Sequence, residues 1–344
     1  MAFIEATRQN ILPLTTLPYE AGREASYDIS RVGFLATVKL RFKGTANCTH
    51  ATKTTFTKAA GAPFNLASRI KLLLNNGVAI WDTSGVGAYW QNLLNRRNNR
   101  MDEIITGSKV FAFGNTVSST GADNDICFSF DLNVSINDRD MIGLLLLQNN
   151  QVVATVKVDN AAASVLMTDS DVTTTLTGNW YISIEYFDVP SNTADWPVLS
   201  SVHQVLEDQS PITATGANRF VIPRGNTYMR LINGIMLNGA YNTDDVERCT
   251  IKYNLSNEPY NMTAADMLAL QRSRYGRDLP KGVLAWDFFF QGEPNMGNHR
   301  DFIYSGNVTE LDQYIHIASG ATLGSNNNKL ITVRDMLVDV QPSQ

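Results

Sequence analysis

The sequence predicts an all-β protein made of two consecutive jelly-roll or other β-sandwich domains, each with one short embedded helix. Three observations lead to this fold class: strand-like runs recur along the chain, a polar segment with two prolines divides it, and the same features follow in the same order on both sides. With 344 residues, 44% of them hydrophobic, the chain is long enough to fill two cores.

The first half contains five strand-like runs separated by turn residues. Towards its end, the run at residues 34–42 (FLATVKLRF) alternates apolar and polar side chains, which is the period of a half-buried strand. Clusters of Asn, Asp and Gly interrupt the pattern, as at residues 75–77 and 121–124. The other β-rich runs are 69–74, 126–136, 152–158 and 180–189.

One segment of the first half has helical periodicity instead. Thr83 or Ser84 is in position to cap its N-terminus. Arginines within residues 95–100 place positive charge at its C-terminal end, where the helix dipole favours it. The side chains that recur at the spacing of one helix face are Val86, Tyr89, Trp90, Leu93 and Leu94.

The segment PSNTADWP at residues 190–197 predicts the domain boundary, because two prolines and small polar residues are typical of a linker. The predicted organisation is therefore an N-terminal arm over residues 1–25, a first jelly roll over 26–190, a linker over 191–198 and a second jelly roll over 199–344.

The second half repeats the mixture of strands and one helix. The helix is expected to begin at Thr263, which opens a T-x-x-D pattern typical of a helix N-terminus. Its predicted apolar face consists of Ala264, Met267, Leu268 and Leu270. Strands are predicted at residues 228–237, 248–255, 283–290, 313–318 and 330–340.

Both halves present their features in the same order. Each helix is followed by an aromatic strand with a central aspartate, Asp131 in the run FSFDL and Asp287 in the run LAWDF. An Arg-Asp-apolar stretch comes next, at residues 139–142 and 300–303, and each half closes on a strand that runs to Asp-Val. Three matches in one order predict that the second domain duplicates the first.

Composition restricts the classes of function. A formal net charge of −5 argues against a primary nucleic-acid binder, which needs a basic stripe. Charged residues make up only 18%, and Asn, Ser and Thr replace them; such surfaces are buried against a neighbour at low desolvation cost. We therefore expect neighbouring subunits to cover the sheet edges and rims.

Three widely spaced cysteines, Cys48, Cys127 and Cys249, form neither a disulfide framework nor a zinc pattern, and we expect reduced thiols in a protein made in a cytosol. Residues 1–25 lack the apolar core of a signal peptide, so secretion is not expected. The most apolar run, residues 141–147, is too short to cross a bilayer.

No residue pattern selects a catalytic or metal centre. Phosphate-binding glycine loops and nucleophile elbows are missing from the sequence, and the four histidines lack ligand spacing. The Asp-x-Asp pairs at 123–125, 138–140 and 169–171 offer oxygens to calcium, but none continues into an EF-hand loop, so we expect solvated loop acids.

We therefore expect a protein that is not an enzyme and that holds no cofactor or metal. The alternative is a carbohydrate-binding or glycoside-hydrolysing jelly-roll protein, because two carboxylates from distant parts of the chain could converge in space. That alternative requires an exposed aromatic platform, whereas Trp90, Trp180 and Trp286 lie within periodic patterns typical of a core.

The first half also contains motifs that resemble a known family. They are APFNLASRIKLLLNNG at residues 62–77, IWDT at 80–83 followed by the helix, and Arg31, GFL at 33–35 and GT at 44–45 in the opening strand. These residues resemble the first domain of double jelly-roll major capsid proteins of tailless, membrane-containing double-stranded DNA viruses, especially tectivirus-like bacteriophages. The second half has the same strand-helix-strand order, so the resemblance covers nearly the whole chain.

The resemblance implies a structural protein of the virion capsid, made in the host cytoplasm. Three copies would form a pseudo-hexagonal capsomer, and capsomers would tile an icosahedral shell, usually over an internal membrane. The implied partners are the homotrimer, neighbouring trimers, minor capsid or penton proteins and, as a minority hypothesis, the inner membrane. Sequence-specific binding of nucleic acid is not expected.

Five residues are candidates for assembly contacts. By resemblance the N-terminal segment, with Phe3, Ile4 and Arg8, would lie on the inner face of the shell, against neighbouring capsomers or lipid. If the halves are duplicates, Asp131 and Asp287 would contact equivalent neighbours in a pseudo-sixfold capsomer. The alternative for both aspartates is simple outward alternation on a strand.

Overall fold

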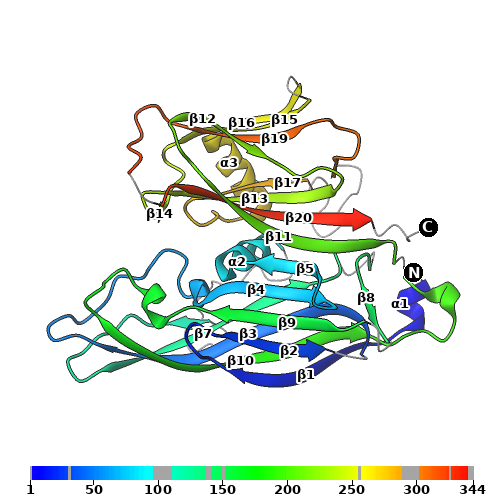
Figure 1. Cartoon of the computed structure of the whole chain (residues 1–344), viewed down its shortest axis with the longest axis horizontal. Coiled ribbons are helices and arrows are strands. Elements are labelled where there is room, and N and C mark those ends of the chain that lie inside the picture. Colours follow the sequence, from blue (N-terminus) through cyan, green and yellow to red (C-terminus); the bar gives the residue numbers. More distant parts are fainter. Residues whose placement is uncertain are drawn as a thin grey trace. The chain divides into compact units, whose positions relative to one another are not determined.

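The computed structural model describes residues 2–29, 32–95, 111–136, 141–148, 152–197, 199–254, 257–288, 302–324 and 327–339. Strands predominate in these ranges, and the chain divides into two compact units, unit 1 (Met1–His203) and unit 2 (Gln204–Gln344) (Figure 1). The division falls shortly after residues 191–198, where the sequence predicted a linker.

Unit 1 contains two antiparallel sheets. One consists, in order, of β1 (Gln9–Pro18), β10 (Thr173–Phe187), β3 (Gly33–Thr49), β7 (Ala122–Asn133) and β6 (Ala112–Phe113), with β8 (Leu145–Leu147) also paired with β3. The other consists of β5 (Val78–Thr83), β4 (Ala67–Leu74), β9 (Ala154–Asn160) and β2 (Glu24–Ile29). The helical elements are α1 (Ala2–Ala6), α2 (Gly85–Leu94) and the 3-10 turns η1 (Phe64–Leu66), η3 (Ala163–Leu166) and η4 (Thr193–Asp195).

Unit 2 also contains two antiparallel sheets. One consists of β11 (Ser201–Pro211), β20 (Lys329–Asp339) and β13 (Thr227–Leu237), and β13 also pairs with β14 (Ala240–Tyr241), β17 (Val283–Asp287) and β18 (Ile303–Tyr304). The other consists of β12 (Gly216–Val221), β19 (Leu311–Ile317), β15 (Val246–Tyr253) and β16 (Asn257–Thr263). The helix of this unit is α3 (Ala264–Tyr275).

The two units have the same topology. The eight main strands, in chain order, are β1, β2, β3, β4, β5, β7, β9 and β10 in unit 1, and β11, β12, β13, β15, β16, β17, β19 and β20 in unit 2. In both units the first, eighth, third and sixth strands form one sheet, and the second, seventh, fourth and fifth form the other. This is the jelly-roll arrangement, so the predicted fold class is confirmed.

The embedded helix also has the same place in both units, between the fifth and sixth strands. Asp131 on β7 and Asp287 on β17 therefore lie on topologically equivalent strands, as the predicted duplication requires. The Arg-Asp pairs of the predicted repeat, at residues 139–140 and 300–301, lie outside the described residues.

The core of unit 1 follows from the alternation of strand side chains. Leu40 and Phe42 of β3 point inwards and are fully buried. The Phe42 ring lies 5.4 Å from Phe128 of β7 and 5.0 Å from Trp180 of β10, centroid to centroid. The Trp180 indole nitrogen donates to the Asn160 side chain at 2.8 Å, which satisfies the polar atom of this buried ring.

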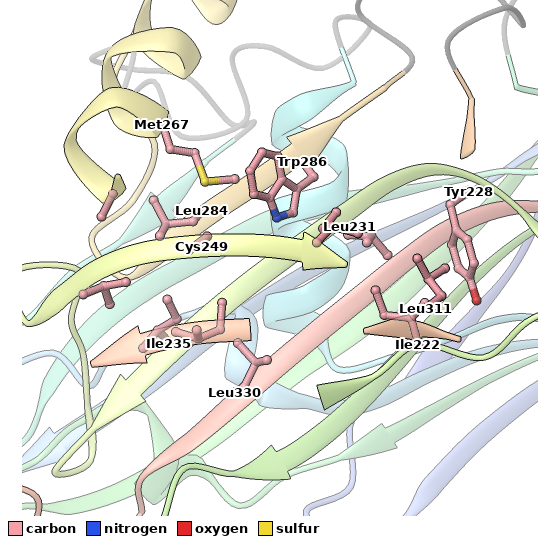
Figure 2. Packing of buried hydrophobic residues seen from close by; sticks show 14 of the residues in the cluster. Ile222, Tyr228, Leu231, Ile235, Cys249, Met267, Leu284, Trp286, Leu311 and Leu330 are labelled. Atoms are coloured by element: carbon pink, nitrogen blue, oxygen red, sulfur yellow. The ribbon is translucent and has the colours of Figure 1, made fainter. Parts of the chain in front are cut away.

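The core of unit 2 joins its two sheets and α3. Figure 2 shows Met267 of α3 beside Trp286 and Leu284 of β17, with Leu231 of β13 nearby. All four side chains are buried. The strand residues come from alternate positions, so a single apolar face of each strand is used.

The helices begin where the sequence predicted. The Ser84 hydroxyl accepts from the Gly87 amide at 3.0 Å, and the Thr263 hydroxyl accepts from the Asp266 amide at 3.1 Å. Gly276 ends α3 at φ +67°, a left-handed conformation that glycine adopts without strain.

The buried face of α3 differs from the prediction. It consists of Ala264, Met267, Gln271 and Tyr275, whereas Leu268 and Leu270 are only half-buried. The Gln271 side chain donates to the Ala285 carbonyl at 3.1 Å, so a polar residue occupies the inner side by satisfying a strand carbonyl.

Residues 1–25, where the sequence predicted a terminal arm, include a strand of the first sheet. β1 pairs with β10 along its length, with a register irregularity between Pro13 and Thr15. Proline cannot donate a ladder hydrogen bond, so Pro13 and Pro18 suit a strand at the end of a sheet.

Candidate assembly surface

The outer side of the sheet containing β10, β3 and β7 carries charged side chains around a hollow in its surface. Its outward side chains alternate with the core residues of the same strands. Together with residues 13–16 of β1, most of them line an open hollow of about 630 Å³. We call the following residues the charged face: Lys39, Arg41, Ser129, Asp131, Tyr181, Ser183 and Glu185.

The charges of this face are already partly compensated. The Lys39 amine lies 2.6 Å from the Glu185 carboxylate, and Asp131 is the direct cross-strand neighbour of Lys39. The Arg41 guanidinium lies over the Tyr181 ring, 5.0 Å from its centroid. Surface ion pairs contribute about 0–1 kcal/mol, so the face adds little to the stability of an isolated subunit.

The strand beside the charged face presents apolar side chains to solvent. Ile11 of β1 is 66% exposed and lies opposite Glu185 in the register, so both side chains are on the outer side of the sheet. Leu12 is also exposed. Among the described residues, β1 pairs with a strand on one side only, which leaves a backbone edge available to a neighbour.

The three N-terminal candidates have different environments. Phe3 is buried within unit 1, where its ring packs edge-on against Phe34 and Phe187 at centroid distances of 5.4 and 5.5 Å. Ile4 and Arg8 are exposed. The Phe3 ring therefore packs α1 against the sandwich. Of the three candidates, Ile4 and Arg8 are the ones whose side chains reach the surface.

The two predicted aspartates also differ. Asp131 is half-buried on the charged face, whereas Asp287 is buried. Arg230 of β13 lies 3.2 Å from Asp287 and 3.2 Å from Asp335 of β20, and the Tyr275 hydroxyl of α3 donates to Asp287. Asp287 thus lies on the side of β17 opposite the core residues Leu284 and Trp286, and it is buried there with Arg230 as its ion-pair partner.

The pKa shifts in this buried network keep Arg230 and Tyr275 protonated. Burial alone would lower the pKa of Arg230, but the carboxylates of Asp287 and Asp335 outweigh it and raise the pKa. Burial, reinforced by the Asp287 carboxylate, raises the pKa of Tyr275 well above its usual value. Arg230 therefore stays protonated, and Tyr275 stays a hydrogen-bond donor.

The Asp-x-Asp pairs have protein partners rather than the purely solvated environment that was expected. The Lys53 amine lies 2.8 Å from Asp169 and 2.6 Å from Asp171, and its hydrogen bonds lower the pKa of both carboxyls. The Asp123 carboxylate accepts from Asn47 at 2.7 Å. The pair at 138–140 lies outside the described residues.

The described residues lack the features of a metal site, of a membrane-spanning helix and of an aromatic platform formed by the three tryptophans named above. They contain no group of three or more His, Cys, Asp or Glu side chains placed to hold a metal. In the same part of the chain no helix is both long and apolar enough to span a membrane. Trp90, Trp180 and Trp286 are buried, so they do not form the exposed platform that carbohydrate binding requires.

Sequence reasoning missed Lys39, Arg41 and Arg230. The alternation in residues 34–42 places Lys39 and Arg41 on one side of a strand, which was a usable signal. Arg230 gave no such signal, because its partner Asp287 is 57 residues away in the chain.

Two jelly rolls in one chain define the double jelly-roll fold. Solved structures with this fold, similar over nearly the whole chain, include the major capsid proteins of STIV (Sulfolobus Turreted Icosahedral Virus), of Faustovirus and of bacteriophage PM2 (protein P2). The motif resemblance to double jelly-roll capsid proteins is thereby confirmed at the level of the fold. No family model and no curated protein matches the chain.

The similarity is one of structure rather than of sequence. The STIV protein has a TM-score of 0.71 at 12% identity, with 96% of this chain and 97% of that chain covered. The Faustovirus protein has a TM-score of 0.65 at 10% identity, covering 98% and 91%. The PM2 protein has a TM-score of 0.55 at 11% identity, covering 97% and 98%.

Proposed function

We propose that this protein is the major capsid protein of an icosahedral virus, and that it works as a structural subunit rather than as an enzyme. The observation that carries the proposal is the double jelly roll itself, formed by two topologically identical units over the whole chain. The capsid proteins named above have the same fold over at least 91% of their own lengths.

The proposed assembly unit is a homotrimer. Three chains with two equivalent jelly rolls each give a ring of six similar units around a threefold axis, which is a pseudo-hexagonal capsomer. Repeated contacts between such capsomers, and with minor capsid or penton proteins, would close the shell. The mechanism is geometric, and no covalent bond is made or broken.

The remaining parts of the proposal concern location. We place the assembled protein in the virion capsid, after synthesis in the host cytoplasm, with an internal membrane beneath the shell. Asp131, Ile4 and Arg8 are proposed contact residues because they reach the surface of unit 1.

Sedimentation or multi-angle light scattering of the purified chain tests the trimer. The expected mass is three times the 38.0 kDa of one chain. A protein that stays monomeric at every concentration, with and without candidate minor proteins of the same virus, would contradict the proposal. Clear hits on a glycan array, or hydrolysis of a glycoside, would favour the carbohydrate alternative.

A further inference from the structure

The duplicated units carry the same pair of charges at the same topological position. Asp131 on the sixth strand of unit 1 is the cross-strand neighbour of Lys39 on the third. In unit 2, Asp287 on the sixth strand is the cross-strand neighbour of Arg230 on the third. The two units therefore share this pair of charges as well as the strand order.

An acid on the eighth strand completes each set. Glu185 of β10 lies 2.6 Å from Lys39, and Asp335 of β20 lies 3.2 Å from Arg230. Each unit therefore has a cation on its third strand between acids on the sixth and eighth strands.

The two sets differ in burial. In unit 2 the exposed fractions of the Arg230 and Asp287 side chains are 7% and 2%. In unit 1 those of Lys39 and Glu185 are 36% and 13%, and Lys39 and Asp131 line the open hollow of about 630 Å³. The set is therefore more exposed in unit 1 than in unit 2.

We infer that the charged face, together with Ile11 of β1, is the surface on which a second copy of this chain docks. This inference rests on the proposed capsid function and names the contact that would build the trimer. The supporting observation is that the set of charges buried in unit 2 has its counterpart in unit 1 open to solvent in the single chain. Contacts around a threefold axis would cover it.

The physical chemistry of the face suits this occupant. Its lysine is already paired with Glu185, so docking does not bury an unpaired charge at that point. Tyr and Arg are enriched in protein interfaces, and Arg41 already rests on Tyr181. Ile11 adds exposed apolar area beside these polar groups. Closure around a threefold axis requires a heterologous contact, so the neighbour contributes a different patch of its own surface.

Two exposed residues of unit 1 give a matched test. Ile11 on β1 is 66% exposed and Val78 on β5 is 54% exposed, and both are β-branched and apolar. Ile11→Asp places a charge in the proposed contact, whereas Val78→Asp places the same charge elsewhere on the unit. Since both sites are solvent-exposed in the single chain, we expect neither substitution to unfold it.

The oligomeric state of the full chain is measured by sedimentation velocity over a dilution series, with circular dichroism to verify the fold. Ile11→Asp should raise the concentration of half-dissociation at least ~10-fold, whereas Val78→Asp leaves it unchanged. Lys39→Glu, which gathers three acids on the face, should dissociate the trimer similarly, and added salt should partly restore it.

The possible results separate the inference from the proposed function. An unsubstituted chain that never forms a trimer would contradict the proposed function. A stable wild-type trimer that tolerates both Ile11→Asp and Lys39→Glu would overturn this inference alone. Equal dissociation by Val78→Asp would also overturn it, because the effect would not be specific to the charged face.

Discussion

Arg230 of β13 is a buried side chain that connects several elements of unit 2. Its guanidinium pairs with Asp287 of β17 and Asp335 of β20, the two strands on either side of β13. The Tyr275 hydroxyl donates to Asp287 and so connects this carboxylate to α3. A buried ion pair is weak evidence for net stability, but removal of one partner leaves a charge in a medium that solvates it poorly. The network therefore joins four elements, β13, β17, β20 and α3, and the loss of a carboxylate should be costly.

Asp287→Asn should lower the free energy of unfolding by about 3 kcal/mol, because the buried Arg230 loses an anionic partner. Urea unfolding at fixed protein concentration measures the change. The matched control is Asp244→Asn, which breaks the ion pair with Lys281 at a site that is 72% exposed and should cost less than about 0.5 kcal/mol. Equal effects of the two substitutions would contradict the role given to Asp287.

The three thiols should be protected in the folded chain. All three cysteines are buried, and burial raises the pKa of each thiol, to about 12 for Cys249. The thiolate is the reactive form, so a disulfide reagent at pH 8 should react slowly with the folded protein and rapidly with three thiols in urea. A fast-reacting thiol in the folded protein would count against this description of the core.

The same pKa shifts predict a pH dependence of stability. Folded thiols keep their protons at pH values where unfolded thiols, with a pKa near 8.5, release them. The unfolded state then binds fewer protons, so stability is present in full below about pH 8.5 and declines as the pH rises above it. Urea unfolding of the Cys249→Ser variant should show a weaker decline than that of the unsubstituted chain.

At the scale of elements, the helices are specified locally and some strands are not. Ser84 and Thr263 cap α2 and α3 through bonds to residues three positions later, so the sequence pattern contains both partners. β1 lacks such a signal, because Pro13 and Pro18 interrupt the strand pattern and its order depends on pairing with β10. A terminal arm was predicted because the local pattern of residues 1–25 gives no information about pairing with the distant β10.

Thr263→Ala should destabilise the protein by about 1 kcal/mol, because the Asp266 amide loses its acceptor at the start of α3. Thr263→Ser keeps the hydroxyl and should remain close to the unsubstituted protein. Thermal unfolding of both variants measures the difference. If Thr263→Ser destabilised the protein as much as Thr263→Ala, the threonine methyl group rather than the capping hydroxyl would be responsible.

The limits of sequence reasoning at the candidate surface have the same origin. Alternation in residues 34–42 predicts that Lys39 and Arg41 share one side of a strand. Which side faces a hollow depends on β10 and β7, which pair with β3 from distant parts of the chain. For the same reason the central aspartates of the two equivalent strands could be aligned from sequence, but the deeper burial of Asp287 could not be predicted.

At the scale of the whole molecule, the repeated topology is the feature on which the proposed function depends. Two jelly rolls with the same strand order and the same embedded helix make each chain a pair of similar building blocks. Such a chain needs only threefold symmetry to surround an axis with six similar units. With only 18% charged residues in the chain, the proposed contacts between copies would be buried at a low desolvation cost.

Negative-stain electron microscopy of the purified trimer fraction can show the capsomer itself. We expect end-on views with a six-lobed outline and threefold symmetry, two lobes for each chain. Particles with a different number of lobes, or preparations that contain only single two-lobed chains at all concentrations, would rule out the proposed capsomer.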